Sequence, residues 1–172
     1  CNEEDIYKMF YNPDESAYNK FKEMRERLDL DYGKNTTAKG HALEELVLEI
    51  FKNIKGVSGT NEIKTCTNQF DFTLLCGLKP VMLTIFTYLT PYFIIECKNE
   101  PENKPNNTYC NKLESIMDTN AAQLGIVFGR IDATSTCFTI SREHYLTYKN
   151  SSAQKILITC SDTDLTYLID KK

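Results

Sequence analysis

A strongly apolar run that ends in charged residues reads, from residue 93 to residue 99, Phe93-Ile94-Ile95-Glu96-Cys97-Lys98-Asn99. Its β-branched and aromatic residues predict a strand that enters a core. Residues two apart on a strand point to the same face, so we expect Glu96 and Lys98 side by side and Cys97 on the other face. Charges near a core cost free energy unless they are paired, bind a metal or take part in chemistry. The alternative is a surface ion pair at a strand end, which contributes about 0–1 kcal/mol.

The length of the chain, 172 residues, predicts one main domain with a substantial core. We expect residues 1–32 to form an N-terminal helical extension and residues 33–172 to form the domain. Hydrophobic residues make up 41% of the chain and charged residues 26%, as in soluble globular proteins. The longest apolar run, residues 81–95, has only 15 residues and is too short to span a membrane. The first residue is not Met, so neighbouring domains could lie outside this sequence.

The seven cysteines are scattered singly and form no CxxC pair, which argues against a structural zinc site. Several lie in strand-like runs, where a free Cys behaves as a small apolar residue, and we expect a reduced, cytoplasmic protein. The net charge of −4 argues against nonspecific nucleic-acid binding by the whole surface but allows a local basic patch. The residues that could build such a patch are Lys34, Lys39, Lys98, Lys104, Lys112, Arg130 and Arg142.

The most clearly amphipathic segment is residues 38–55, for which the pattern predicts a helix capped by Thr36 or Thr37. Its apolar stripe consists of Leu43, Leu46, Val47, Ile50, Phe51 and Ile54. At about 100° per residue, Glu45 falls on the solvated side, whereas Glu44 lies at the rim of the stripe. A rim glutamate either extends to solvent or belongs to a site next to the core.

Strand-like and helical segments alternate along the rest of the chain. Strands are expected at 62–67, 70–76, 81–89, 124–129 and 155–160, and helices at 110–122, 138–150 and 162–169. Residues 1–32 have a helical pattern that Pro13 interrupts. Asp71 is unusual because Asp is disfavoured in strands and here it lies within an apolar run. The run 124–129 is apolar throughout, as expected of a strand that is buried on both faces.

The order of these features resembles the PD-(D/E)xK nuclease superfamily, and within it the Mrr-like restriction endonuclease domains. The residues that carry the resemblance are Lys39-Gly40-His41-Ala42-Leu43-Glu44, Thr65-Cys66-Thr67-Asn68-Gln69-Phe70-Asp71, Phe93-Ile94-Ile95-Glu96-Cys97-Lys98-Asn99 and Leu124-Gly125-Ile126-Val127-Phe128. They cover residues 38–130. Two departures are Phe70, which stands where the motif has Pro, and the long spacing between Asp71 and Glu96.

The resemblance implies an α/β fold with a restriction-endonuclease-like αβββαβ core, in which helices flank a mixed central sheet. It also implies a Mg²⁺ ion, for which Mn²⁺ can substitute, held by Asp71, Glu96, Glu44 and the backbone carbonyl of Cys97. Lys98 would orient the attacking water or neutralise developing charge. Further contacts with substrate would come from Gln69, Asn99, Lys39 and His41, although a capping or surface role is open for His41. Hard oxygen ligands around Mg²⁺ suit phosphodiester hydrolysis, because the ion stabilises phosphoryl charge and lowers the pKa of water.

Three classes of function follow. The first is a metal-dependent endodeoxyribonuclease in restriction, defence or nucleic-acid processing, with DNA as partner and with either a homodimer or a separate targeting domain or subunit. The second is a nuclease-fold module that has lost activity and acts in nucleic-acid binding or regulation. The third is glycoside hydrolysis by a carboxylate pair, which needs neither the lysine nor this strand order. Dependence on a divalent cation would separate the first class from the third.

Overall fold

The computed structural model of the chain describes residues 3–64, 69–77, 88, 91–137, 139, 143 and 154–170. Within the strands, the side chains of residues 60–64 and 69–72 lie outside this description. The elements, in chain order, are α1 (Glu3–Phe10), α2 (Glu15–Glu26), the 3₁₀ helix η1 (Arg27–Asp29), α3 (Thr36–Lys52), β1 (Val57–Lys64), β2 (Gln69–Cys76), β3 (Tyr92–Lys98), α5 (Asn107–Asn120), β4 (Leu124–Gly129), β5 (Ile156–Cys160) and α7 (Asp162–Asp170).

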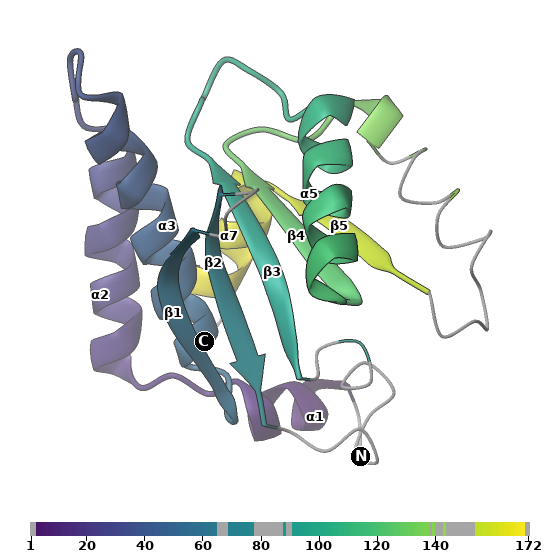
Figure 1. Ribbon diagram of the computed structural model, residues 1–172. Coiled ribbons are helices and arrows are strands. Elements are labelled where there is room, and N and C mark those ends of the chain that lie inside the picture. The colour runs from purple at the N-terminus through teal and green to yellow at the C-terminus, as the bar shows by residue number, and fades with distance from the viewer. Residues whose placement is uncertain are drawn as a thin grey trace.

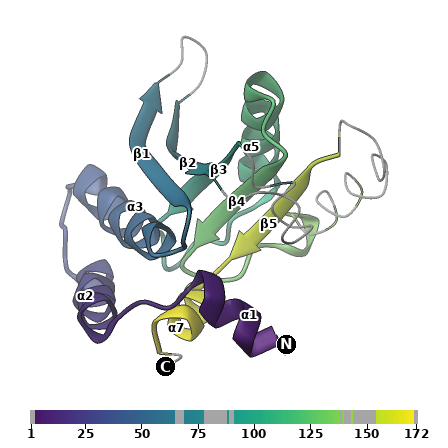
Figure 2. The ribbon, with the colours of Figure 1, turned by 90° about the horizontal axis from the view of Figure 1, so that it is seen from below.

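The fold is α/β, with a mixed sheet of five strands in the order β1-β2-β3-β4-β5 (Figure 1). Strand β2 pairs antiparallel with β1 and with β3, whereas β3, β4 and β5 are parallel. Helices α2, α3 and α7 cover one face of the sheet and α5 covers the other (Figure 2). The helix between β3 and β4 is the crossover that a parallel pair requires. No helix in the described part of the chain is long and apolar enough to cross a membrane.

Successive side chains of β3 point alternately into two apolar clusters, one on each face of the sheet. Phe93 and Ile95 belong to the larger cluster under α3, and Cys97 packs against it, whereas Ile94 belongs to the smaller cluster under α5. Glu96 has the same parity as Ile94, and it contacts a residue of α5. The predicted strand phase is therefore confirmed.

Most predicted elements are present, with shifted ends. The helix predicted at 38–55 is α3, but its N-cap is Asn35, whose side chain accepts a hydrogen bond from the Ala38 N–H, so the prediction of Thr36 or Thr37 is wrong. Strand β1 begins at Val57, earlier than predicted. Gly59 makes this early start feasible, since a Cβ there would meet Leu48 at 2.5 Å. The strand predicted at 81–89 and the helix predicted at 138–150 lie outside the described residues, apart from isolated positions.

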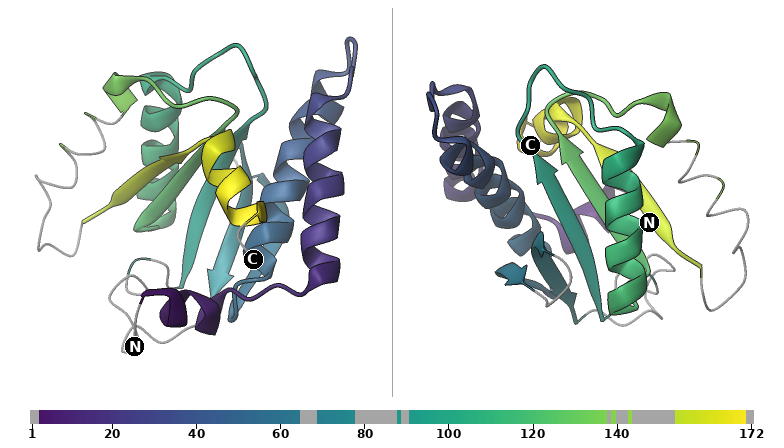
Figure 3. Two further views of the ribbon diagram at one scale, coloured as in Figure 1. Left: turned by 180° about the vertical axis from the view of Figure 1, so that it is seen from behind. Right: turned by 45° about the horizontal axis from the view of Figure 1, so that its top comes forward.

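The N-terminal helices are integrated into the main core. Tyr18, Phe21 and Leu28 are buried in the same cluster as the apolar stripe of α3 and the α3 side of the sheet. Asp14 caps α2 by accepting from the Ala17 N–H, as the break at Pro13 indicated. Residues 1–32 were predicted as an extension, but α2 lies in the layer of helices on one face of the sheet, where it packs against α3 and α7 (Figure 3).

One pair of cysteines differs from expectation. Cys110, in the first turn of α5, forms a disulfide with Cys137, which lies 27 residues further along the chain. The prediction that all cysteines are reduced is therefore wrong for this pair, whereas Cys76 and Cys160 keep free thiols. Single, widely spaced cysteines carry no signal of pairing, because only the packing of α5 brings these two together.

Candidate functional site

The beginning of α3, the end of β3 and the beginning of α5 meet at one end of the sheet (Figures 1 and 3). At this end β2 and β3 part. Their pairing runs from Leu75 with Tyr92 to Phe72 with Ile95, whereas β3 stays paired with β4 as far as Lys98. Continued by one step, the antiparallel register places Asp71 level with Glu96. Asp71 thus lies one residue beyond the last observed pair of β2 with β3, and its side chain lies outside the described residues.

Glu96 is a buried carboxylate whose hydrogen bonding is incomplete. Its side chain is 8% exposed, and Oε1 accepts from Nζ of Lys112 at 2.5 Å. The other oxygen, Oε2, is buried and has no hydrogen-bond partner within the described part of the chain. Burial raises the pKa of Glu96, and Lys112 and Lys98 only partly oppose that effect. A buried, half-satisfied carboxylate is costly, and such groups are concentrated at sites that bind a cation or do chemistry.

Lys98 lies on the same face of β3 and is held by two neighbours. Its Nζ is 2.5 Å from Oε1 of Glu100 and 5.0 Å from the ring centroid of Tyr109 in α5. Burial lowers the pKa of Lys98, but hydrogen bonds and charge interactions with Glu100 and Tyr109 outweigh burial and raise it overall. Lys98 is therefore an ammonium ion at neutral pH, suited to neutralising negative charge and unable to serve as a general base.

Glu44 faces this site from α3. Its side chain is 19% exposed, and Oε2 lies 2.9 Å from Nδ1 of His41, one turn earlier in the helix. The charge of Glu44 contributes to raising the pKa of Glu96, which places the two carboxylates in one electrostatic environment. Glu45, in contrast, pairs with Arg27 at 3.1 Å on the exposed side of α3. The predicted difference between these adjacent glutamates is confirmed.

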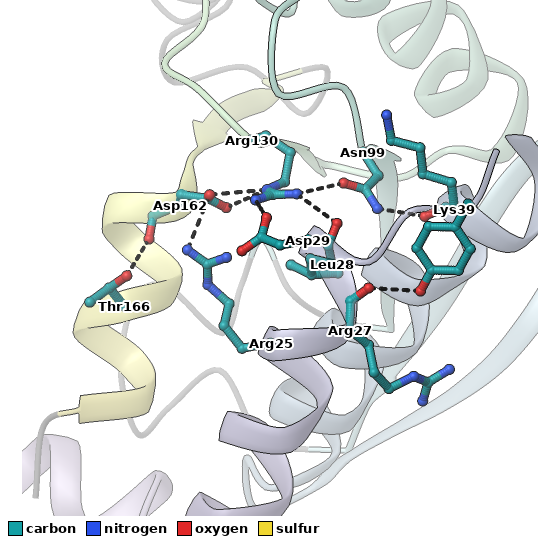
Figure 4. Close-up of polar contacts among 10 residues, drawn as sticks. Arg25, Arg27, Leu28, Asp29, Lys39, Asn99, Arg130, Asp162 and Thr166 are labelled. Atoms are coloured by element: carbon teal, nitrogen blue, oxygen red, sulfur yellow. Dashed lines mark hydrogen bonds and ion pairs between the residues drawn. The ribbon is translucent and has the colours of Figure 1, made fainter.

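Asn99, Lys39 and Arg130 connect the elements that carry the site (Figure 4). The side-chain amide of Asn99 donates to the Lys39 carbonyl at 2.6 Å and accepts from Arg130 at 3.0 Å. Arg130 follows β4, and its side chain is only 5% exposed. It also donates to Asp162, Asp29 and the Leu28 carbonyl. The expectation that Arg130 belongs to a DNA-contacting surface is wrong, because its guanidinium is enclosed by these acceptors.

Several predicted ligands stay predictions. Gln69 and Asp71 lie on β2, but their side chains are outside the described residues. Asn99 uses its amide inside the protein, and Lys39 contributes its carbonyl there. Among the described side chains, which do not include that of Asp71, no group of three or more His, Cys, Asp or Glu residues could hold a metal.

Two residues of α5, Tyr109 and Lys112, belong to the site. The sequence indicated Lys112 only as part of a possible basic patch and did not indicate Tyr109. Both contact the charged end of β3, Tyr109 through Lys98 and Lys112 through Glu96. Their spacing of three puts them on one face of the helix. This spacing is visible in the sequence, but it identifies Tyr109 and Lys112 as site residues only when α5 is known to pack over the end of β3.

Comparison with known proteins found no matching family model, no matching curated protein and no matching solved structure. The function of this chain must therefore be argued from the chemistry of Glu96 and its neighbours.

Proposed function

We propose that this chain is a divalent-cation-dependent endonuclease that hydrolyses DNA phosphodiester bonds, with a restriction-endonuclease-like core. The observation that carries the proposal is the buried Oε2 of Glu96, which has no hydrogen-bond partner among the described residues, in a site that also holds Glu44 and Lys98. The topology supports it. A helix, three antiparallel strands, a second helix and a parallel strand follow one another as α3, β1–β3, α5 and β4, the order that the resemblance implies.

The residues present fit a hard cation such as Mg²⁺. Glu96 has one oxygen without a hydrogen-bond partner among the described residues, and the charge of Glu44 acts on the same carboxylate. The resemblance adds Asp71 and the backbone carbonyl of Cys97 as further ligands. When bound, such an ion would stabilise phosphoryl charge and supply hydroxide at neutral pH. Near neutral pH the excess of negative charge at this site is unfavourable without a cation, because Glu44 and Glu96 repel each other.

Lys98 would act on the substrate as a cation. Its ammonium is oriented by Glu100 and Tyr109, so that little reorganisation is needed when negative charge develops on the phosphate. Ile94 and Ile95, which precede Glu96 in β3, are 0% exposed, so this strand is anchored in the core directly before the charged residues. The site therefore combines a place for a divalent ion with a fixed ammonium on the same strand face.

A second candidate is an inactive nuclease-fold module that binds nucleic acid or regulates a partner. The contact that favours it is the ion pair between Lys112 and Glu96, which partly neutralises the carboxylate without a metal. This candidate predicts that the protein needs no divalent cation for its function.

The test is cleavage of supercoiled plasmid, linear duplex DNA and RNA of the same sequence with Mg²⁺ or Mn²⁺. Cutting of DNA that EDTA stops is the expected result. Lys98→Met keeps the aliphatic stem and removes the charge, and it should lower the cleavage rate at least about a hundredfold. Lys22→Met, at an exposed lysine of α2, is the matched control.

Cutting that persists in excess EDTA would exclude the metal mechanism. Absence of cutting on every substrate, together with DNA binding that no cation affects, would favour the inactive module. Faster cutting of RNA would support metal-dependent phosphodiester hydrolysis but would make RNA, and not DNA, the substrate.

A further inference from the structure

The ion pair between Lys112 and Glu96 uses the carboxylate that the proposed cation also needs. Oε1 of Glu96 accepts a hydrogen bond from the Lys112 ammonium at 2.5 Å, and both groups are charged, which makes this a strong interaction. A divalent ion at Oε2 and the Lys112 ammonium at Oε1 would be bound to one carboxylate, where the two positive charges repel each other. Binding of a divalent ion at Glu96 must therefore weaken the contact with Lys112.

The Lys112 ammonium can move away from Glu96. Its side chain is 46% exposed, whereas the Glu96 side chain is 8% exposed, so the lysine reaches into the site from the solvent side. A lysine stem has four rotatable bonds, and its ammonium is well hydrated when released. The carboxylate, held on a buried strand, stays where it is.

A released Lys112 ammonium would lie beside Lys98. The two lysines approach the end of β3 on one side of the sheet, since Lys98 rests over Tyr109, three residues before Lys112 in α5. Negatively charged phosphates are the ligands of such a pair, and lysine binds them as a point charge. The surroundings also include Glu44, which would repel a phosphate unless a cation offsets its charge.

We propose that Lys112 exchanges partners: it neutralises Glu96 in the cation-free protein and contacts a DNA phosphate once a divalent cation has taken Glu96. The inference rests on the proposed nuclease function and deepens it, because it makes cation binding the event that supplies a further phosphate contact. Lys112 thereby neutralises Glu96 in the cation-free protein and binds a phosphate of the substrate in the cation-bound protein.

The first measurement is Mn²⁺ affinity by calorimetry, without DNA. Lys112→Met removes the competing ammonium and should tighten Mn²⁺ binding about tenfold or more, the size of losing one charge-assisted hydrogen bond. The rise in melting temperature that Mn²⁺ produces should also be larger in this variant than in the wild type. Lys112→Gln, which keeps a donor without the charge, covers the case in which Lys112→Met folds poorly. Lys22→Met should match the wild type.

The second measurement is binding of a DNA duplex in Ca²⁺ and in EDTA, over a series of salt concentrations, with the duplex checked for integrity. Loss of one phosphate contact lowers the slope of log K against log salt by about 0.9. Lys112→Met should show this reduction in Ca²⁺ and no reduction in EDTA. Lys112→Arg should keep the wild-type slope under both conditions.

Mn²⁺ affinities of Lys112→Met and wild type that agree within about twofold would overturn the exchange while leaving the nuclease proposal intact. An equal loss of slope in Ca²⁺ and EDTA would also overturn it, because Lys112 would then contact phosphate whether or not a cation is bound. A wild type that binds no Mn²⁺ would instead overturn the proposed function, and the exchange with it.

Discussion

Two buried charges lie at the ends of neighbouring parallel strands, and the protein treats them differently. Arg130 follows β4, and all three of its guanidinium nitrogens donate to acceptors from η1, α7 and the residue that follows β3, namely Asp29, Leu28, Asp162 and Asn99 (Figure 4). Glu96, near the end of β3, has a partner for one oxygen and none for the other within the described residues. Every guanidinium nitrogen of Arg130 therefore has a hydrogen-bond acceptor, whereas one carboxylate oxygen of Glu96 has no partner among the described residues.

The pKa directions express the same contrast. Burial lowers the pKa of Arg130, but hydrogen bonds and charges of Asp29 and Asp162 outweigh burial and raise it. Burial also dominates at Glu96, where the pKa is raised although Lys112 and Lys98 oppose the effect. The environment of Arg130 thus stabilises its charged form, whereas that of Glu96 does not. We infer that Arg130 serves the fold and that Glu96 is kept for a ligand.

The largest expected effect is on stability, from Arg130→Met. This change leaves the buried Asn99 amide oxygen and the Leu28 carbonyl without their donor, at about 1–3 kcal/mol each. Asp162 keeps its pair with Arg25, at 3.1 Å, which limits the damage. We expect the free energy of unfolding to fall by about 3 kcal/mol in urea titrations.

The control is Arg27→Met, because Arg27 and Glu45 are both about half exposed and their pair contributes at most about 0.5 kcal/mol. If both arginine variants lose the same small amount, the Arg130 network does not stabilise the fold as its geometry indicates.

An intermediate effect is expected at Glu44, the carboxylate that adds to the charge around Glu96. Glu44→Gln should weaken Mn²⁺ binding about tenfold, as for the loss of a ligand or of a group that orients one. Glu45→Gln removes the same charge one residue later, outside the site, and should leave the affinity unchanged. Calorimetry measures the Mn²⁺ affinity of both variants. Equal affinities would show that Glu44 does not take part in binding the cation.

The smallest expected effect is a gain of stability in Glu96→Gln, measured in EDTA. The raised pKa of Glu96 means that the folded state disfavours its ionised form, so wild-type stability is fully present below the ordinary pKa of about 4.3 and declines as pH rises through the folded value. Glu96→Gln has no ionisable group at this position, so its free energy of unfolding does not fall with pH for this reason. At pH 7 we expect it to be more stable on the order of 1 kcal/mol, because Lys112, left alone, is 46% exposed and can be hydrated.

Urea titrations between pH 4 and pH 8 measure this difference. The advantage of the variant should be absent at the acidic end and should widen towards neutral pH. A variant that is less stable than the wild type at pH 7 would show that the pair with Lys112 outweighs burial, and the contrast with Arg130 would disappear.

Periodicity alone was sufficient for the framework of the protein. The apolar stripe with Glu44 at its rim became α3, and the fully apolar run 124–129 became β4, buried along its whole length. The alternation of β3 placed Glu96 and Lys98 on one face before any contact was known. These features are readable because helix and strand geometry translate residue spacing directly into direction.

Only the tertiary structure decided which groups meet. Lys112 lies 16 residues from Glu96, and Arg130 joins residues more than 100 positions apart, so no local spacing identifies these partners. The same holds for the pairing of Cys110 with Cys137. A charged residue in a sequence shows that burial would cost free energy there. Whether the fold supplies all of its hydrogen-bond partners, as at Arg130, or leaves one oxygen without a partner among the described residues, as at Glu96, depends on how the helices pack on the sheet.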